Sequence, residues 1–115
     1  MEVTRVSKAN GAVDRQVVRV LHLTLKRRWF DMIASGEKRE EYREAKPYWT
    51  TRLAGKEFDV IRFRNGYAKD SPTMDVEFKG LGYGLGSPEW GGGSKPVYIL
   101  SLGTVLTHND GGEWR

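Results

Sequence analysis

Alternating and helical patterns of apolar residues divide the first half of the chain into short elements. Residues 17–25, VVRVLHLTL, are rich in β-branched side chains and predict a strand that is covered on both faces. In residues 27–35, apolar side chains recur at i, i+3 and i+4, which predicts a short amphipathic helix that packs on the sheet. Gly36 stands where a glycine commonly ends a helix.

A densely charged segment follows this helix. Residues 36–43, GEKREEYR, contain six charged side chains in eight positions. Neither face of a strand in this segment would be apolar, so we expect it at an edge of the sheet or beside a cleft. From Pro47 to near Gly55 the chain predicts a short helical turn. Further strands are predicted at residues 58–64, 74–80 and 96–106, and the last, being the most apolar, is expected at the centre of the sheet.

This order of elements predicts an α+β, mainly β fold. We expect a small barrel of about five to six strands with one or two short helices, and not a doubly wound parallel sheet. One domain is expected over residues 16–106, with a disordered tail at residues 1–15 and a polar tail at residues 107–115. The glycine-rich segment 80–95 is interpreted as a connection, and whether it acts as a lid stays open.

The composition excludes several kinds of chemistry. The chain of 115 residues has no cysteine, which rules out disulfides, a zinc ribbon and thiol catalysis. With only two histidines, we expect neither a metal site nor a cofactor. No apolar stretch is long enough to span a membrane and no signal peptide is recognisable, so we expect a cytoplasmic protein, not bound to a membrane and monomeric.

The charge balance favours an anionic partner. The net charge is +4 and the isoelectric point is near 9.5, a mild basic bias that suits RNA or a nucleotide as well as an ordinary basic protein. The glycine-rich segment 80–95 matches neither a dinucleotide-binding fingerprint nor a phosphate loop. We therefore looked for a nucleic-acid site among the charged strands.

Three residues of the charged segment are the first candidates. Glu41 and Arg43 are two residues apart, so on a strand they point the same way. They form either a plain surface pair or a cleft wall in which Arg43 offers its forked donors to a phosphate or base edge. Lys38 follows the predicted helix end, where it either offsets the negative end of the helix or contacts a ligand.

A second basic wall is predicted on the next strand. Arg62 and Arg64 share one face there, with Asn65 and Tyr67 at its end, although a solvated strand face explains the same pattern. Lys26 completes the set of expected ligand-binding residues. Basic residues interleaved with aromatic rings suit single-stranded nucleic acid, because bases stack and phosphates pair with cations.

Residues 21–43, LHLTLKRRWFDMIASGEKREEYR, resemble the opening of an ASCH domain (activating signal cointegrator homology), a family within the PUA-like β-barrels. The resemblance lies in a strand, a short apolar helix, a Gly-x-Lys turn and a charged strand with Glu and Arg at fixed spacing. The matching positions are Gly36, Lys38, Glu41 and Arg43, and the likeness covers roughly residues 17–106. It implies a PUA-like pseudobarrel with a cleft for RNA, a nucleotide or a nucleoside beside the Lys-Glu-Arg strand.

The resemblance also implies a possible activity. One branch of the family hydrolyses an N-acetylated cytidine with the signature lysine and a threonine three residues later, and here Glu41 stands at the threonine position. The first hypothesis is therefore an RNA- or nucleotide-binding module. The alternative is a small hydrolase, either an amidohydrolase of a modified nucleoside or a ribonuclease, with Lys38 and Glu41 as a tentative acid–base pair. A protein-interaction module without a ligand is the third possibility.

Overall fold

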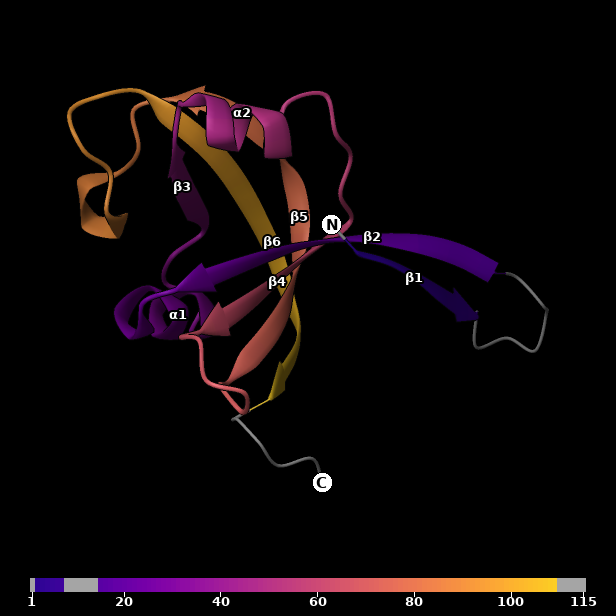
Figure 1. The fold of residues 1–115 in the computed structure, drawn as a ribbon. Coiled ribbons are helices and arrows are strands. Elements are labelled where there is room, and N and C mark those ends of the chain that lie inside the picture. The colour runs from indigo at the N-terminus through magenta and orange to yellow at the C-terminus, as the bar shows by residue number, and fades with distance from the viewer. Residues whose placement is uncertain (1, 8–14, 110–115) are drawn as a thin grey trace.

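Six strands form one curled sheet in the order β1-β2-β4-β5-β6-β3 (Figure 1). The computed structural model describes residues 2–7 and 15–109. Its elements are β1 (Glu2–Ser7), β2 (Arg15–Leu25), α1 (Arg27–Ala34), β3 (Glu40–Glu44), α2 (Pro47–Leu53), β4 (Val60–Asn65), β5 (Thr73–Gly84), the 3-10 turn η1 (Pro88–Trp90) and β6 (Val97–Asn109). The predicted α+β, mainly β, barrel-like fold is confirmed.

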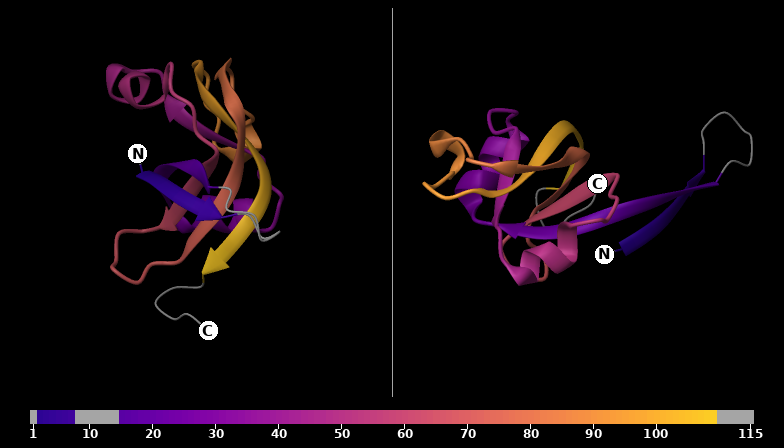
Figure 2. Two further views of the ribbon diagram at one scale, coloured as in Figure 1. Left: turned by 90° about the vertical axis from the view of Figure 1, so that its right-hand side faces the viewer. Right: turned by 90° about the horizontal axis from the view of Figure 1, so that it is seen from above.

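The curl of the sheet comes from its two longest strands. β5 pairs with β4 through residues 73–77, whereas β6 pairs with β3 through residues 97–101. Between these two regions the β5–β6 ladder has register shifts at residues 75–80, and Gly80 has a φ of +141°. Such irregularities bend and twist a strand pair. The two ends of the sheet consequently turn toward each other, and the half-barrel encloses a core (Figure 2).

The crossover between β2 and β4 carries the elements that matter for the site. These two strands are the parallel pair of the sheet, so the chain must leave it and return. On the way it forms α1, then β3 on the far edge, then α2 (Figure 1). The start of α1 and the strand β3 are thereby placed on opposite sides of one opening of the half-barrel.

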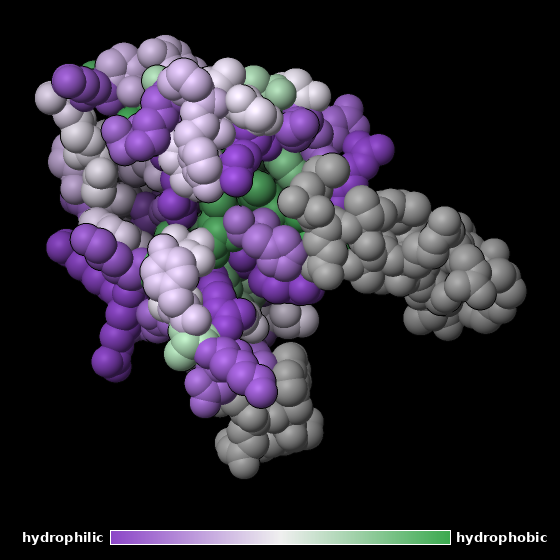
Figure 3. Space-filling model, in the orientation of Figure 1, coloured by the Kyte–Doolittle hydropathy of each residue, from purple (hydrophilic) through white to green (hydrophobic). Residues whose placement is uncertain are grey.

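Apolar side chains of the sheet and of α1 form the core. Leu21 and Leu23 of β2 lie opposite Ile61 and Phe63 of β4 in the ladder, and all four are buried. The remaining buried members of the cluster are Leu25, Phe30, Ile33, Leu53, Phe58, Met74, Val76 and Leu100. On the face drawn in Figure 3, hydrophilic residues surround a narrow apolar strip at the open side of the half-barrel.

The structure differs from the predicted tails at both ends. Residues 2–7 form β1 instead of a disordered tail, because they pair antiparallel with residues 15–20 of β2. At the other end β6 continues to Asn109 and pairs with β5 as far as Thr73, so the polar tail does not begin at residue 107. Residues 1, 8–14 and 110–115 lie outside the described part of the chain.

One prediction about strand position is confirmed and one is wrong. β3 is an edge strand, as its charged faces indicated, whereas β6 lies next to the edge and not at the centre, because its outer neighbour is the short β3, which pairs with residues 97–101 alone. Within the described residues, no helix is long and apolar enough to cross a membrane.

Candidate functional site

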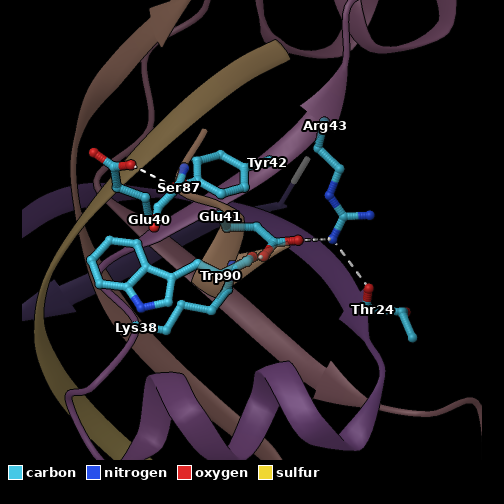
Figure 4. Close-up of polar contacts among 8 residues, drawn as sticks. All are labelled: Thr24, Lys38, Glu40, Glu41, Tyr42, Arg43, Ser87 and Trp90. Carbon is cyan, nitrogen blue, oxygen red and sulfur yellow. Dashed lines mark hydrogen bonds and ion pairs between the residues drawn. The ribbon is translucent and has the colours of Figure 1, made fainter. Parts of the chain in front are cut away.

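Three charged side chains from the GEKREEYR segment meet inside the half-barrel (Figure 4). Lys38 Nζ lies 3.3 Å from Oε1 of Glu41, and Arg43 Nη2 lies 2.9 Å from Oε2 of the same carboxylate. Only 2% of Lys38 and 6% of Glu41 are exposed. We call these three residues the charged row. One buried carboxylate holds two cations, so the row carries a net positive charge.

The end of α1 explains how a lysine reaches this position. Gly36 adopts a φ of +85°, which glycine accommodates without strain, and the Lys38 N–H donates to the Met32 carbonyl at 3.0 Å. Lys38 therefore lies in the turn before β3 and not on the strand itself. This turn directs the Lys38 side chain inward toward the Glu41 carboxylate.

Aromatic rings and one backbone carbonyl complete the surroundings of the Lys38 ammonium. It lies 4.9 Å from the centroid of the Trp29 ring and 4.8 Å from that of Tyr42. It also donates a hydrogen bond of 2.6 Å to the Trp90 carbonyl. Cation–π contacts and charge-assisted hydrogen bonds together offset the loss of water around a buried ammonium. Burial nevertheless lowers the pKa of Lys38, and the nearby Glu41 carboxylate opposes this effect.

Arg43 is held rigidly at the other end of the charged row. Its Nη2 donates to the Thr24 carbonyl at 3.2 Å, and its guanidinium lies 4.9 Å above the Trp49 ring of α2. Its Nε is buried and has no hydrogen-bond partner within the described residues. The guanidinium is therefore fixed, and an acceptor from outside the protein can reach only the 17% of the side chain that stays exposed.

An open cleft of about 580 Å³ lies beside Arg43, between the start of α1, strand β3 and the connection from β4 to β5. We call it the α1–β3 cleft. Three cations line this cleft: Lys26, Arg27 and Arg43. The polar residues Asn65 and Tyr67, both predicted for the site, line it too, as do Trp29 and Glu41. Tyr67 is 89% exposed at its rim. The volume lies within the range of small-ligand sites.

Five of the predicted site residues therefore line one cleft, and three do not. Lys38 lies behind the cleft wall, since its side chain is buried against Glu41 and Trp29. Arg62 and Arg64 line a separate hollow of about 280 Å³ that shares Thr24 with the cleft.

The second basic wall is largely engaged within the protein. Arg62 forms two hydrogen bonds with Asp75, at 2.7 and 2.9 Å, because the two residues are partners in the β4–β5 ladder. Arg64 donates to the Ala68 carbonyl and, at 3.0 Å, to the Lys69 carbonyl. These contacts brace the connection that presents Tyr67, so the role of Arg64 here is to position the rim of the cleft.

Sequence reasoning missed several residues of the site. Trp29 packs against the core and also lines the cleft, where it contacts both Lys38 and Arg28. Arg27 could have been found from the basic run Lys26–Arg28 at the predicted helix start. The backbone carbonyls of Thr24 and Trp90 had no signal in the sequence, because every residue carries such a group.

The glycine-rich segment packs closely on the charged row. We call residues 85–96, which connect β5 to β6 and include η1, the η1 loop. A Cβ at Gly86 would lie 2.7 Å from the Tyr42 ring, and one at Gly91, whose φ is +95°, would lie 3.0 Å from the Trp29 ring. The Tyr42 hydroxyl donates to Glu40 at 2.7 Å and accepts the Ser87 N–H at 2.8 Å. Trp90, expected to be exposed, is half-buried.

Comparison with known proteins adds no assignment. No family model, no curated protein and no solved structure matches the chain. The resemblance to ASCH domains therefore stays a prediction that rests on the residues quoted for it. In residues 2–7 and 15–109, no group of three or more histidine, aspartate and glutamate side chains is placed to hold a metal ion.

Replacing Glu41 with Gln should destabilise the fold strongly. The substitution keeps the shape but leaves the Lys38 and Arg43 cations buried without their shared anion, which costs about 3–5 kcal/mol of the free energy of unfolding. Lys38→Met should cost less, because Glu41 and Arg43 still form a neutral pair. Glu44→Gln, at a residue of the same strand whose side chain is 76% exposed, should change stability by less than about 0.5 kcal/mol. Denaturant unfolding measures all three, and equal losses for Glu41→Gln and Glu44→Gln would contradict the charged row.

Tyr42 should make folding stability sensitive to alkaline pH. Burial and the hydrogen bond to Glu40 raise the pKa of Tyr42 to about 12 from an ordinary value of 10.0. The folded state holds this proton more tightly, so the stability due to the hydroxyl is complete below pH 10 and is lost as the pH rises toward 12. The difference in the free energy of unfolding between wild type and Tyr42→Phe should shrink over this interval. Tyr67→Phe, which removes an exposed hydroxyl, is the matched control, and a difference that stays constant with pH would refute the prediction.

Proposed function

We propose that the protein binds single-stranded RNA or a nucleotide in the α1–β3 cleft. The observation that carries this proposal is the open cleft itself, which combines three cations with an exposed tyrosine ring at its rim. Cations pair with phosphates, and an exposed ring stacks on a base whatever its identity. The net charge of +4 supports the same class of ligand.

Arg43 is the residue best prepared to contact this ligand. Glu41, Thr24 and Trp49 fix its guanidinium, so little conformational entropy is lost when it binds an acceptor. The exposed part of its guanidinium lines the cleft, where a phosphate oxygen or base edge would accept from it. Lys26 and Arg27 add exposed positive charge on the opposite wall. The resemblance to ASCH domains implies a site at the same strand.

Lys26→Ala should weaken binding of a fluorescently labelled single-stranded RNA. Removal of one phosphate contact should lower affinity by about three- to tenfold and reduce the slope of log affinity against log salt by about 0.7. Lys56→Ala is the matched control, because Lys56 is an exposed lysine that follows α2 and does not line the cleft. Fluorescence anisotropy at several salt concentrations measures both effects. Equal losses for the two variants would show non-specific attraction, and no binding at low salt would remove the proposal.

The hydrolase alternative has one specific observation in its favour. Lys38 and Glu41 are in contact at 3.3 Å, and a lysine whose pKa is lowered by burial is closer to the range of a general acid–base catalyst. In the closed arrangement the Trp90 carbonyl accepts the hydrogen bond of the ammonium and Lys38 is only 2% exposed, so hydrolysis at Lys38 requires the η1 loop to move first.

An activity measurement decides between binding and hydrolysis. If the alternative holds, wild-type protein should cleave an N-acylated nucleoside or RNA, and Lys38→Met should abolish turnover per folded molecule, with folding checked by circular dichroism. Lys56→Met is the control for loss of a lysine elsewhere. Wild-type protein that turns over neither substrate, or Lys38→Met with full turnover, eliminates the hydrolase.

A further inference from the structure

The Lys38 ammonium donates a hydrogen bond to a carbonyl group of the chain, and a ligand could offer a group of the same kind. The Trp90 carbonyl, an amide oxygen of the chain itself, accepts its hydrogen bond at 2.6 Å. Carbonyl oxygens of the same kind are carried by three of the four RNA bases, cytosine, uracil and guanine, but not by adenine. Trp29 and Glu41 contact Lys38 and also line the α1–β3 cleft, so the ammonium lies one side chain behind the cleft wall.

Two hydrogen bonds and the close packing of Gly86 on the Tyr42 ring and of Gly91 on the Trp29 ring hold the η1 loop over Lys38. The polar contacts described between this loop and the charged segment are the Lys38–Trp90 bond and the Ser87–Tyr42 bond. The loop has glycines at both of its ends: Gly84 and Gly86 lie before η1, and Gly91 to Gly93 follow it. Glycines allow a large change in backbone direction over one or two residues. The loop can thus move as a unit without disturbing the ladder of β5 and β6.

We propose that the η1 loop is a lid, and that Lys38 binds a carbonyl oxygen of a nucleobase when the lid opens. The Trp90 carbonyl satisfies the buried ammonium in the closed state, and the ligand carbonyl replaces it in the open state. The aromatic rings of Trp29 and Tyr42 and the Glu41 carboxylate keep the ammonium in place during this exchange. This inference rests on the proposed function and adds the part of the ligand that is recognised.

The exchange explains why a lysine is buried at a ligand site. An ammonium without an acceptor would be costly in this apolar setting, so opening in the absence of ligand is unfavourable. A ligand that supplies the missing acceptor binds the open state better and shifts the equilibrium toward it. A ligand without a carbonyl at that position gains only the contacts of the outer cleft.

Two variants loosen the lid without changing Lys38. Tyr42→Phe keeps the ring beside the ammonium and removes the hydroxyl that accepts the Ser87 N–H. Gly91→Ala places a Cβ 3.0 Å from the Trp29 ring and forces a side chain into a φ of +95°, which should make opening about five- to thirtyfold more frequent. Gly93→Ala is the matched control, since its Cβ would have no atom within 4 Å and its φ is not positive.

The first experiment follows chemical labelling of Lys38 by an amine-reactive reagent with mass spectrometry. Lys38 should label slowly in wild type and in Gly93→Ala. It should label faster in Tyr42→Phe, and about five- to thirtyfold faster in Gly91→Ala. Hydrogen exchange at the Leu100 amide in the core reports global unfolding, which exposes much surface and speeds up strongly with denaturant, whereas Lys38 labelling through a local opening should depend only weakly on denaturant. Equal Lys38 labelling in all four proteins, or labelling that depends on denaturant as steeply as Leu100 exchange, would overturn the lid.

The second experiment compares inosine 5′-monophosphate with adenosine 5′-monophosphate. On the same ring carbon, the inosine nucleotide carries a carbonyl group and the adenosine nucleotide an amino group. Wild-type protein should bind the inosine nucleotide about tenfold more tightly or better, because only its carbonyl replaces that of Trp90. Lys38→Met should abolish this preference, so that the two nucleotides bind with equal affinity. Calorimetric titration provides both affinities.

The outcomes separate this inference from the proposed function. If both nucleotides bind equally and Lys26→Ala weakens both, the cleft binds nucleotides but Lys38 does not recognise the base, and the inference falls alone. If neither nucleotide nor labelled RNA binds, the proposed function falls and the inference with it. A preference that survives in Lys38→Met assigns the recognition to another residue and also overturns the inference.

Discussion

The structure depends on the burial of two cations around one carboxylate. Taking Lys38, Glu41 and Arg43 out of water costs free energy that their mutual attraction only partly offsets, so the surroundings must supply the rest. Two aromatic rings and a backbone carbonyl do so at Lys38, and a third ring and a second carbonyl do so at Arg43. Each of these groups comes from a different element of the fold. The charged row therefore fixes the relative positions of α1, α2, β3 and the η1 loop.

If the protein binds an anionic ligand as proposed, the same requirement couples stability to that binding. A cluster with more positive than negative charge is not electrically balanced by the protein, and an anionic ligand beside Arg43 would balance it. Apolar side chains at these three positions would hold the same elements together at a lower cost in free energy, because replacing buried ion pairs in other proteins by well-packed apolar residues is often neutral or stabilising. The retention of charge at the centre of the half-barrel, next to an open cleft, is accordingly better explained by recognition than by stability.

Sequence reasoning predicted the fold class well and the site in part. Glu41 and Arg43 were placed together correctly, because the alternation of a strand fixes the relative direction of residues two apart. Lys38 was expected after the end of the helix, but its contact with Glu41 could not be derived, because its direction depends on the φ of Gly36 in the turn before β3. Arg62 was expected in the cleft, but its ladder partner Asp75 lies on a strand whose register cannot be read from either segment alone.

The strand that carries the site has its partner far away in the sequence. β3 pairs with β6, and Glu44 lies opposite Val97, so more than fifty residues separate the two sides of this ladder. The entropy of closing such a long loop delays this pairing relative to local contacts, and proteins rich in distant contacts fold slowly. During synthesis on the ribosome, β3 therefore stays unpaired until its partner β6 has emerged. Four of the five side chains of β3 are charged, and these charges oppose the edge-to-edge aggregation to which an apolar strand would be prone.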